Sequence, residues 1–165
     1  MKKLVLLLPL FLFTGLYIPE EFYPMLMTRS QLEASVELTH TALPLTSPGK
    51  ICLYQNWIFL VEKHKGIHLI DNTNPANPVR KDFLKVPGCV DVAVRNNILY
   101  VDNAVDLVAV RLDPENSTAT VVARRNFALP EMLSPDGYIP TKYSRSMRPA
   151  NTEIIGWIST FNDIE

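Results

Sequence analysis

The stretch Asn56-Trp-Ile-Phe-Leu-Val-Glu62 recurs as Asn96-Asn-Ile-Leu-Tyr-Val-Asp102, at an offset of 40 residues. A period of this length is typical of a supersecondary unit that stacks on its neighbour to bury an apolar face. The chain therefore holds two units, repeat 1 at 48–86 and repeat 2 at 87–127. The flanking segments repeat at offsets of 39 or 40 residues: Pro48-Gly49 with Pro87-Gly88, Ile67–Ile70 with Leu107–Val110, and Asn74-Pro75 with Asp113-Pro114.

Both units are predicted to consist of antiparallel β-strands. In Cys89–Val94 the valines alternate with other residues, which is the period of a half-buried strand. Continuous apolar runs at Trp57–Val61 and Ile98–Val101 indicate strands that are covered on both faces. Further strands are expected at Thr118–Arg124 and Glu153–Ile158. Turn signals about 8 to 12 residues apart accompany this pattern, which favours an all-β fold.

The expected architecture is two propeller-blade-like antiparallel sheets packed as a sandwich or a partial propeller. A propeller usually closes with about four to eight blades, so two units cannot close a ring alone. We expect the two sheets to stack face to face. The strand at Glu153–Ile158, within a C-terminal loop and strand at 128–165, should then complete the edge of one sheet. Assembly of several copies is the other route open to such a chain.

Residues 1–18 have the pattern of a signal peptide. Lys2 and Lys3 precede an apolar run at Leu4–Ile18, which is shorter than the ~20 residues of a membrane-spanning helix. We expect this leader to be helical and the protein to be exported to the periplasm, the outer membrane or the cell surface. It would meet the membrane only through the leader, if the leader stays uncleaved.

Residues 19–47 are predicted to be a linker with a short helix near 28–36. Thr28 with Gln31, or Ser30 with Glu33, fits the spacing of a capping box. Leu32 and Val36 are four residues apart, which places both on one face of such a helix.

The segment Gly66-Ile-His-Leu-Ile-Asp-Asn-Thr-Asn-Pro-Ala-Asn-Pro78 resembles an LVIVD repeat, a propeller-type β-repeat of bacterial surface proteins. In that family an apolar strand ends in Asp and runs into a D/N-P-x-N-P turn. The second copy, Leu107-Val-Ala-Val-Arg111, departs from the pattern at its last position. The wider likeness covers roughly residues 22–112 and is to small exported proteins of Bacteroidetes type. It implies a fold and a compartment, and it implies no activity and no site residues.

The composition excludes several classes of protein. A formal charge of −1, from 16 Lys and Arg against 17 Asp and Glu, excludes a basic nucleic-acid surface. The sequence has no glycine-rich phosphate loop, G-x-S-x-G, H-E-x-x-H or Cys-x-x-Cys motif. We therefore predict no catalytic residues, no cofactor and no enzyme activity. Cys52 and Cys89 could pair in an oxidising compartment or remain small buried thiols.

Three aspartates form the best candidate constellation for chemistry: Asp91, Asp102 and Asp106. Carboxylates that converge at strand ends could hold calcium through oxygen ligands or serve as an acid/base pair. The plainer interpretation is that Asp102 and Asp106 bond the turn backbone while Asp91 pairs with a nearby cation or N–H group. His64 and His68 are four residues apart, but Lys65-Gly66 predicts a turn between them, which argues against a ligand pair.

The segment 130–151 is a candidate partner-binding loop, because structureless stretches of about 20 residues are usually functional or disordered. Its candidate contact residues are Tyr138, Lys142, Tyr143, Arg145 and Arg148. Aromatic residues such as Trp57 and Phe59 could line a sugar or peptide groove, although core packing is the stronger expectation for these two.

Together these patterns predict an exported, non-catalytic β-repeat module that binds or scaffolds an envelope protein or a glycan. The alternatives are a calcium-stabilised structural protein and a hydrolase that uses the clustered aspartates.

Overall fold

The computed structural model describes residues 20–41 and 43–160, so the leader predicted at 1–18 lies outside the described residues. The described chain is mostly β, as predicted. Its elements in chain order are β1 (Phe22–Thr28), α1 (Arg29–Glu33), β2 (Glu37–Thr39), β3 (Pro48–Tyr54), β4 (Trp57–Glu62), β5 (Gly66–Asp71), β6 (Val79–Lys85), β7 (Val92–Arg95), β8 (Ile98–Asn103), β9 (Asp106–Asp113), β10 (Thr118–Arg125), the 3₁₀ turn η1 (Thr141–Tyr143) and β11 (Thr152–Ser159).

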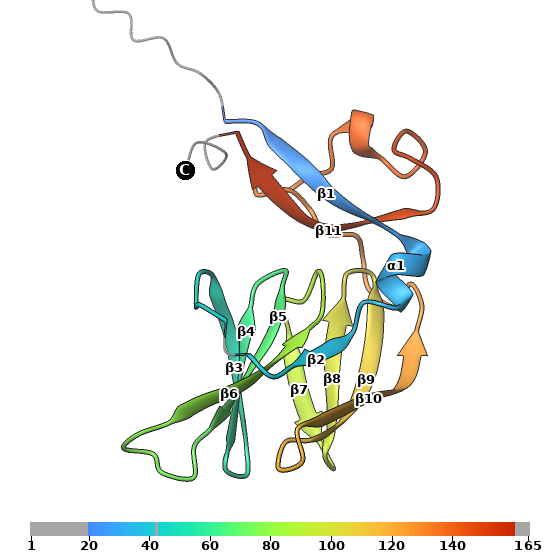
Figure 1. Cartoon of the computed structure of the whole chain (residues 1–165). Helices are drawn as coiled ribbons and strands as arrows, with labels where there is room; N and C mark the ends of the chain where they lie inside the picture. The colour runs from blue at the N-terminus through green and yellow to red at the C-terminus, as the bar shows by residue number, and fades with distance from the viewer. Residues whose placement is uncertain (1–19, 42, 161–165) are drawn as a thin grey trace, which may run out of the picture.

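These strands form three antiparallel sheets (Figure 1). The first sheet has the order β2-β6-β5-β4-β3, and the second has the order β10-β9-β8-β7. A two-stranded terminal sheet pairs β1 with β11. The four strands of repeat 1 thus lie in the first sheet and the four strands of repeat 2 in the second.

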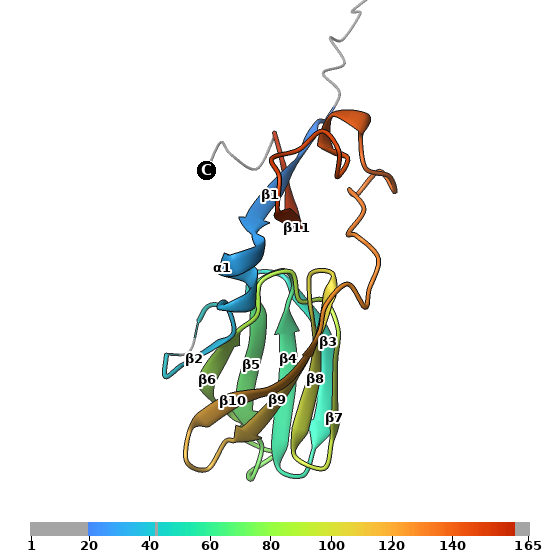
Figure 2. The same cartoon turned by 90° about the vertical axis from the view of Figure 1, so that its right-hand side faces the viewer.

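The two larger sheets turn one face toward each other and share an apolar core (Figure 2). Phe59, Val61 and Leu69 project into it from the first sheet, and Leu99 and Val110 project into it from the second. Each such side chain contributes roughly 1.5–3 kcal/mol when it is fully buried. Each repeat therefore buries its apolar face on the other repeat.

Two-residue turns close the first hairpin of each repeat. Tyr54 pairs with Trp57, and Arg95 pairs with Ile98. Gln55 has a φ of 53°, while Asn96 and Asn97 have φ values of 52° and 60°. In repeat 2 both turn residues thus have a positive φ, whereas in repeat 1 only the first one does. The primed turns that match the twist of a hairpin have a positive φ at both central residues or at the first, and asparagine tolerates this conformation well.

The strand expected at Cys89–Val94 is shorter than its alternating valines predict. β7 begins at Val92, and Val90 is exposed. The backbone N–H groups of Val90 and Asp91 donate to the carboxylate of Asp102, at 2.8–3.0 Å. Because this side chain binds them, the strand ladder starts only at Val92, three residues after the expected start.

The prediction for the C-terminal strand is right about the strand and wrong about its partner. Glu153–Ile158 lies within β11, but β11 pairs with β1 rather than with an edge of either larger sheet. β2 takes that edge place by pairing with Phe83–Lys85 of β6. Residues 19–47, expected to be a linker with one helix, thus contain two strands as well. Pro24 fits within β1 because a strand with a single neighbour needs only some of its N–H groups.

The short helix begins at the predicted cap but is shorter than predicted, because α1 ends at Glu33 and not near residue 36. The Thr28 side chain accepts from the Gln31 backbone N–H, and the Gln31 side chain accepts from the Thr28 N–H. Leu32 is fully buried and anchors α1. Val36 follows the helix and packs against the shared core.

The two cysteines are free thiols. Cys52 lies in β3 and is half-buried, whereas Cys89 is buried at the junction between the repeats. Burial raises the pKa of the Cys89 thiol far above its usual range, so Cys89 is a neutral core residue.

The start of β5 requires glycine. Gly66 has a φ of 151°, and a Cβ atom there would lie 2.1 Å from the carbonyl oxygen of Leu84. Gly66→Ala is therefore expected to lower the free energy of unfolding by about 2 kcal/mol or more, as overpacking does. Chemical denaturation measures this change. Gly49→Ala is the control, because the nearest atom to its new Cβ is the flexible Lys63 side chain at 3.2 Å. Equal losses for the two variants would contradict the argument.

Candidate ligand-binding site

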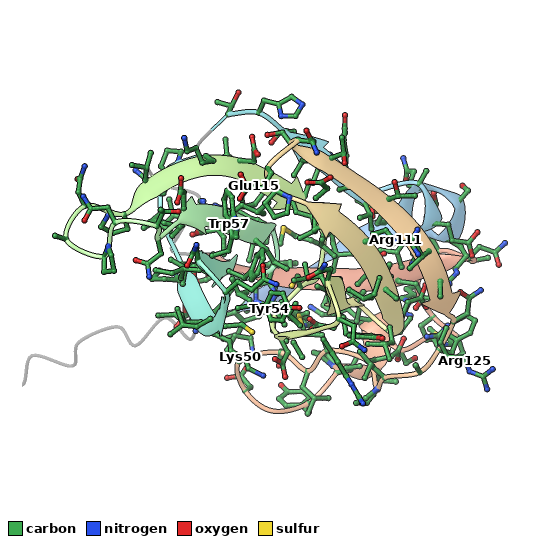
Figure 3. All side chains as sticks on the ribbon, turned by 90° about the horizontal axis from the view of Figure 1, so that it is seen from below. Lys50, Tyr54, Trp57, Arg111, Glu115 and Arg125 are labelled. Atoms are coloured by element: carbon green, nitrogen blue, oxygen red, sulfur yellow. The ribbon has the colours of Figure 1, made fainter. Side chains whose placement is uncertain are left out.

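A cavity of about 470 Å³ opens between the two larger sheets, at the end where the hairpin turns lie. Figure 3 views the molecule from this end and labels Tyr54, Trp57, Arg111 and Glu115. Its apolar lining comes from the inner faces of both sheets: Trp57, Phe59, Val94, Leu99 and Leu112. Its polar lining comes from the turns and strand ends: Gln55, Asn96, Asn97, Arg111, Asp113 and Glu115.

Hydrogen bonds hold the two sides of this cavity in register. The Tyr54 hydroxyl, on the first sheet, donates to the Asn97 side-chain oxygen at 2.9 Å and accepts from the Asn97 N–H at 3.2 Å. Asp113 accepts from the backbone N–H and the side-chain amide of Asn116. These bonds hold the pKa of the Asp113 carboxyl below its usual range, so Asp113 lines the cavity as an acceptor.

Sequence reasoning found the aromatic part of this cavity and missed the rest. Trp57 and Phe59 are both core residues and cavity-lining residues. Among the polar lining residues, Gln55 lies in repeat 1, and the others lie in repeat 2, at least 41 positions further along the chain. The repeat itself could have predicted that these residues lie together, because equivalent hairpins of two stacked sheets place their turns at the same end.

The three candidate aspartates do not converge. Asp102 bonds the backbone at Val90 and Asp91, and burial raises the pKa of its carboxyl despite these bonds. Asp91 is exposed and bonds Lys50 of β3 and the Val92 N–H. Glu62 holds the chain entering β3 in the way Asp102 holds the chain entering β7. It accepts from the backbone N–H groups of Thr46 and Ser47.

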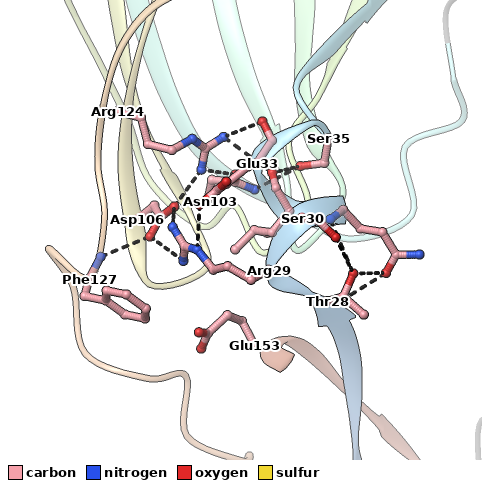
Figure 4. A network of polar contacts seen from close by, with 12 residues as sticks. Thr28, Arg29, Ser30, Glu33, Ser35, Asn103, Asp106, Arg124, Phe127 and Glu153 are labelled. Atoms are coloured by element: carbon pink, nitrogen blue, oxygen red, sulfur yellow. Dashed lines mark hydrogen bonds and ion pairs between the residues drawn. The ribbon is translucent and has the colours of Figure 1, made fainter. Parts of the chain in front are cut away.

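Asp106 is fully buried at the centre of a polar network (Figure 4). Its carboxylate accepts from Arg29 of α1, from Arg124 of β10 at 2.7 Å, and from the Phe127 N–H at 3.0 Å. Burial opposes the charge, but these donors outweigh it and hold the pKa of Asp106 below its usual range. Asp106 therefore fastens the N-terminal helix to the second sheet.

The two histidines have different surroundings and do not form a ligand pair. His68 is buried on β5 and faces Glu62, at 3.4 Å between Nε2 and Oε2, and the Phe83 ring. His64 lies in the β4–β5 turn with a φ of 65°. Within 20–41 and 43–160, no three His, Cys, Asp or Glu side chains gather as a metal site.

The loop at 130–151 packs on the terminal sheet, and its candidate residues divide into two groups. Arg145 and Arg148 bond Glu131 and Glu153, and Arg148 is only 6% exposed. These two arginines hold the loop to β11. Lys142 lies over the rings of Tyr143 and Tyr23, at 4.9 and 5.5 Å from the centroids, while Tyr138 is exposed.

A second hollow, of about 980 Å³, lies between the terminal sheet and the first sheet. Met25, Met27 and Trp157 give it a largely apolar wall, and Lys63 and Lys65 are among its lining residues. It lacks the amide side chains of the cavity between the larger sheets.

Comparison with protein-family models, with curated proteins and with solved structures finds no match to this chain. In the part of the chain that the structure describes, no helix combines the length and the apolar character that crossing a bilayer needs.

A chelator is expected to leave the thermal midpoint unchanged, because protein donors already engage Asp91, Asp102 and Asp106. An ion bound at 100 times its Kd would add about 2.7 kcal/mol of stability, and EDTA would remove that amount. Calorimetry with EDTA and with added calcium measures the difference. A midpoint that falls by several degrees in EDTA would support the calcium-stabilised alternative.

Asp106→Asn is expected to lower the free energy of unfolding by about 3–5 kcal/mol at pH 7, because two guanidinium groups lose a buried counter-charge. Because the pKa of Asp106 is lowered in the folded state, its carboxylate contributes its full stabilisation at pH values above the ordinary carboxyl pKa of about 3.9. This contribution is lost as the pH falls through the folded-state pKa. The gap between wild type and variant should therefore narrow below about pH 4. Urea unfolding between pH 7 and pH 2 measures it.

The control is Asp91→Asn, whose exposed ion pair with Lys50 is screened by solvent. It should change stability much less than Asp106→Asn. A gap between wild type and Asp106→Asn that is constant with pH would contradict the role given to the Asp106 charge.

Proposed function

We propose that the chain is a non-catalytic β-repeat module of the cell envelope that binds a short, uncharged glycan segment in the cavity between its larger sheets. The observation that carries this proposal is the combination of an aromatic floor with a rim of amide and charged side chains. A volume of about 470 Å³ is within the usual range of small-ligand sites.

The lining suits a sugar better than a purely apolar ligand. Trp57 and Phe59 offer aromatic surface on which the C–H face of a sugar ring can pack. Asn96 and Gln55 each offer donor and acceptor atoms for hydroxyl groups. The rim carries one cation, Arg111, and two carboxylates, Asp113 and Glu115, so its net charge disfavours an anionic ligand.

A binding role is supported over hydrolysis by the state of the carboxylates. A glycosidase pairs an ionised carboxylate with a second one whose pKa is raised so that it donates a proton. The pKa of Asp113 is lowered, and Asp102, whose pKa is raised, is bonded to the backbone at Val90 and Asp91.

Two further expectations belong to this proposal. The duplicated four-stranded sheets are consistent with the resemblance to LVIVD repeats and with a partial propeller of two blades. Export through the leader at 1–18 would place the module at the envelope, where glycans are abundant.

Tryptophan fluorescence tests the proposal, because the chain has two tryptophans and only Trp57 lines this cavity. Trp157→Phe leaves Trp57 as the sole reporter. Titration with a panel of neutral trisaccharides, including chitotriose, is expected to change its emission with saturation. Glu115→Gln in this background should weaken the affinity about 5- to 30-fold, which corresponds to roughly 1–2 kcal/mol for one hydrogen bond to a charged group.

The matched control is Arg125→Gln, which removes a charge at the other end of β10, away from the cavity in Figure 3. Its affinity should equal that of the reporter protein. No saturable change with any trisaccharide, or equal losses for both variants, would overturn the glycan proposal.

A further inference from the structure

The first hairpin turn and one register shift occupy corresponding places in the two four-stranded sheets. The hairpin pair Tyr54 and Trp57 corresponds to Arg95 and Ile98, an offset of 41. In repeat 1 the β5–β6 register shifts between Leu69 and Ile70. In repeat 2 the β9–β10 register shifts opposite Ala109 and Val110, at an offset of 40 from those two residues.

In the second strands, β4 and β8, this structural alignment of the two repeats differs by one residue from the alignment of their sequences. The sequence aligns Phe59 with Leu99, whereas the hairpin turns align Phe59 with Tyr100. Because side chains alternate between the faces of a strand, a shift of one residue exchanges the two faces. The inner face of the first sheet therefore corresponds to the outer face of the second.

Burial of the corresponding residues agrees with this exchange. Phe59 is 2% exposed and its counterpart Tyr100 is 39% exposed. Ile67 is fully buried and its counterpart Leu107, at the offset of 40, is 38% exposed. Conversely, Ile51 is 61% exposed while its counterpart Val92 is 1% exposed. The two sheets thus pack front to back, as successive units of a ring do, and not as mirror partners.

Front-to-back packing leaves two unlike faces free at the ends of the stack. We name the outer side of β3 and β4 the trailing face; it carries Ile51, Leu53, Ile58 and Leu60. We name the outer side of the second sheet the leading face; it carries Ala93, Ile98, Tyr100, Leu107 and Ala109. The leading face of the second sheet is equivalent to the inner face of the first sheet. The trailing face of the first sheet is equivalent to the inner face of the second sheet.

We propose that the leading face of one copy of this chain packs on the trailing face of a second copy, so that two to four copies close a ring of four to eight sheets. Such head-to-tail contacts either close or extend into filaments, and rings of about four to eight blades are those that close. Leu53 is 69% exposed, so the trailing face offers a large aliphatic surface for this contact.

The charges along the first strands support the same partner. Lys50 of β3 bonds Asp91 at the entry to β7, and these two residues are 41 positions apart. They occupy equivalent places in the two repeats. A second copy docked in the same way would bring its Lys50 beside Asp91 of the first copy. Opposite charges would then alternate around the ring.

The segment between β2 and β3 limits the part of the first sheet that a second copy can contact. The Arg80 guanidinium donates to the Leu43 carbonyl oxygen at 2.8 Å, and His40 bonds Asp82 at 3.2 Å. This segment is thereby held against β6, on the half of the first sheet away from β3. The contact between copies is therefore centred on β3 and β4.

Sedimentation velocity of the purified protein over a range of concentrations tests the proposal. The wild type is expected to sediment as a dimer, a trimer or a tetramer. Leu53→Asp on the trailing face and Tyr100→Asp on the leading face should each give monomers with unchanged circular dichroism. An equimolar mixture of these two variants should form a 1:1 dimer, because each retains the face that the other has lost.

Met147→Asp is the control, since it alters an exposed apolar side chain in the 130–151 loop; it should sediment as the wild type does. Three outcomes would overturn the proposal. They are a monomeric wild type at every concentration, a Tyr100→Asp variant that still assembles while Leu53→Asp does not, and a mixture that stays monomeric.

Discussion

Neither four-stranded repeat can remove its apolar face from water by itself, and the rest of the structure follows from this constraint. Phe59 and Val61 of the first sheet need Leu99 and Val110 of the second, and these side chains are buried together in the core. The contact between the sheets also creates the cavity at their turn end, where Trp57 belongs to both the core and the lining. A change that separated the two sheets would remove the cavity with the core.

The helix α1 is fastened to the second sheet by charge and not by apolar contact alone. Asp106 receives two guanidinium groups and one backbone N–H from residues that are up to 77 positions away. Burying a carboxylate is unfavourable unless it is paired and hydrogen-bonded, and here each oxygen has at least two donors. Arg124 also donates to the carbonyl oxygens of Leu32 and Glu33 at the end of α1. One polar cluster thus joins α1, β9 and β10.

An acidic residue near the end of the second strand has the same structural role in both repeats. Glu62 and Asp102 each bind two successive N–H groups of the chain that enters the first strand. Such groups would otherwise be left without partners where the ladder has not begun. Asp102, which the sequence offers as a candidate for metal binding or catalysis, is therefore accounted for by backbone hydrogen bonding.

Local patterns in the sequence determined the repeat, the strands at Trp57–Val61 and Ile98–Val101, and the capped helix after Thr28, because each depends on neighbours within a few residues. The tertiary structure alone decided that β11 pairs with β1 and that Asp106 meets Arg29. Those contacts join segments that are far apart in the sequence, and the local sequence of each segment does not specify which other segment it will contact. It also decided that Phe59 corresponds to Tyr100 rather than to Leu99. A strand has two faces one residue apart, and only packing against another sheet selects which of them is buried.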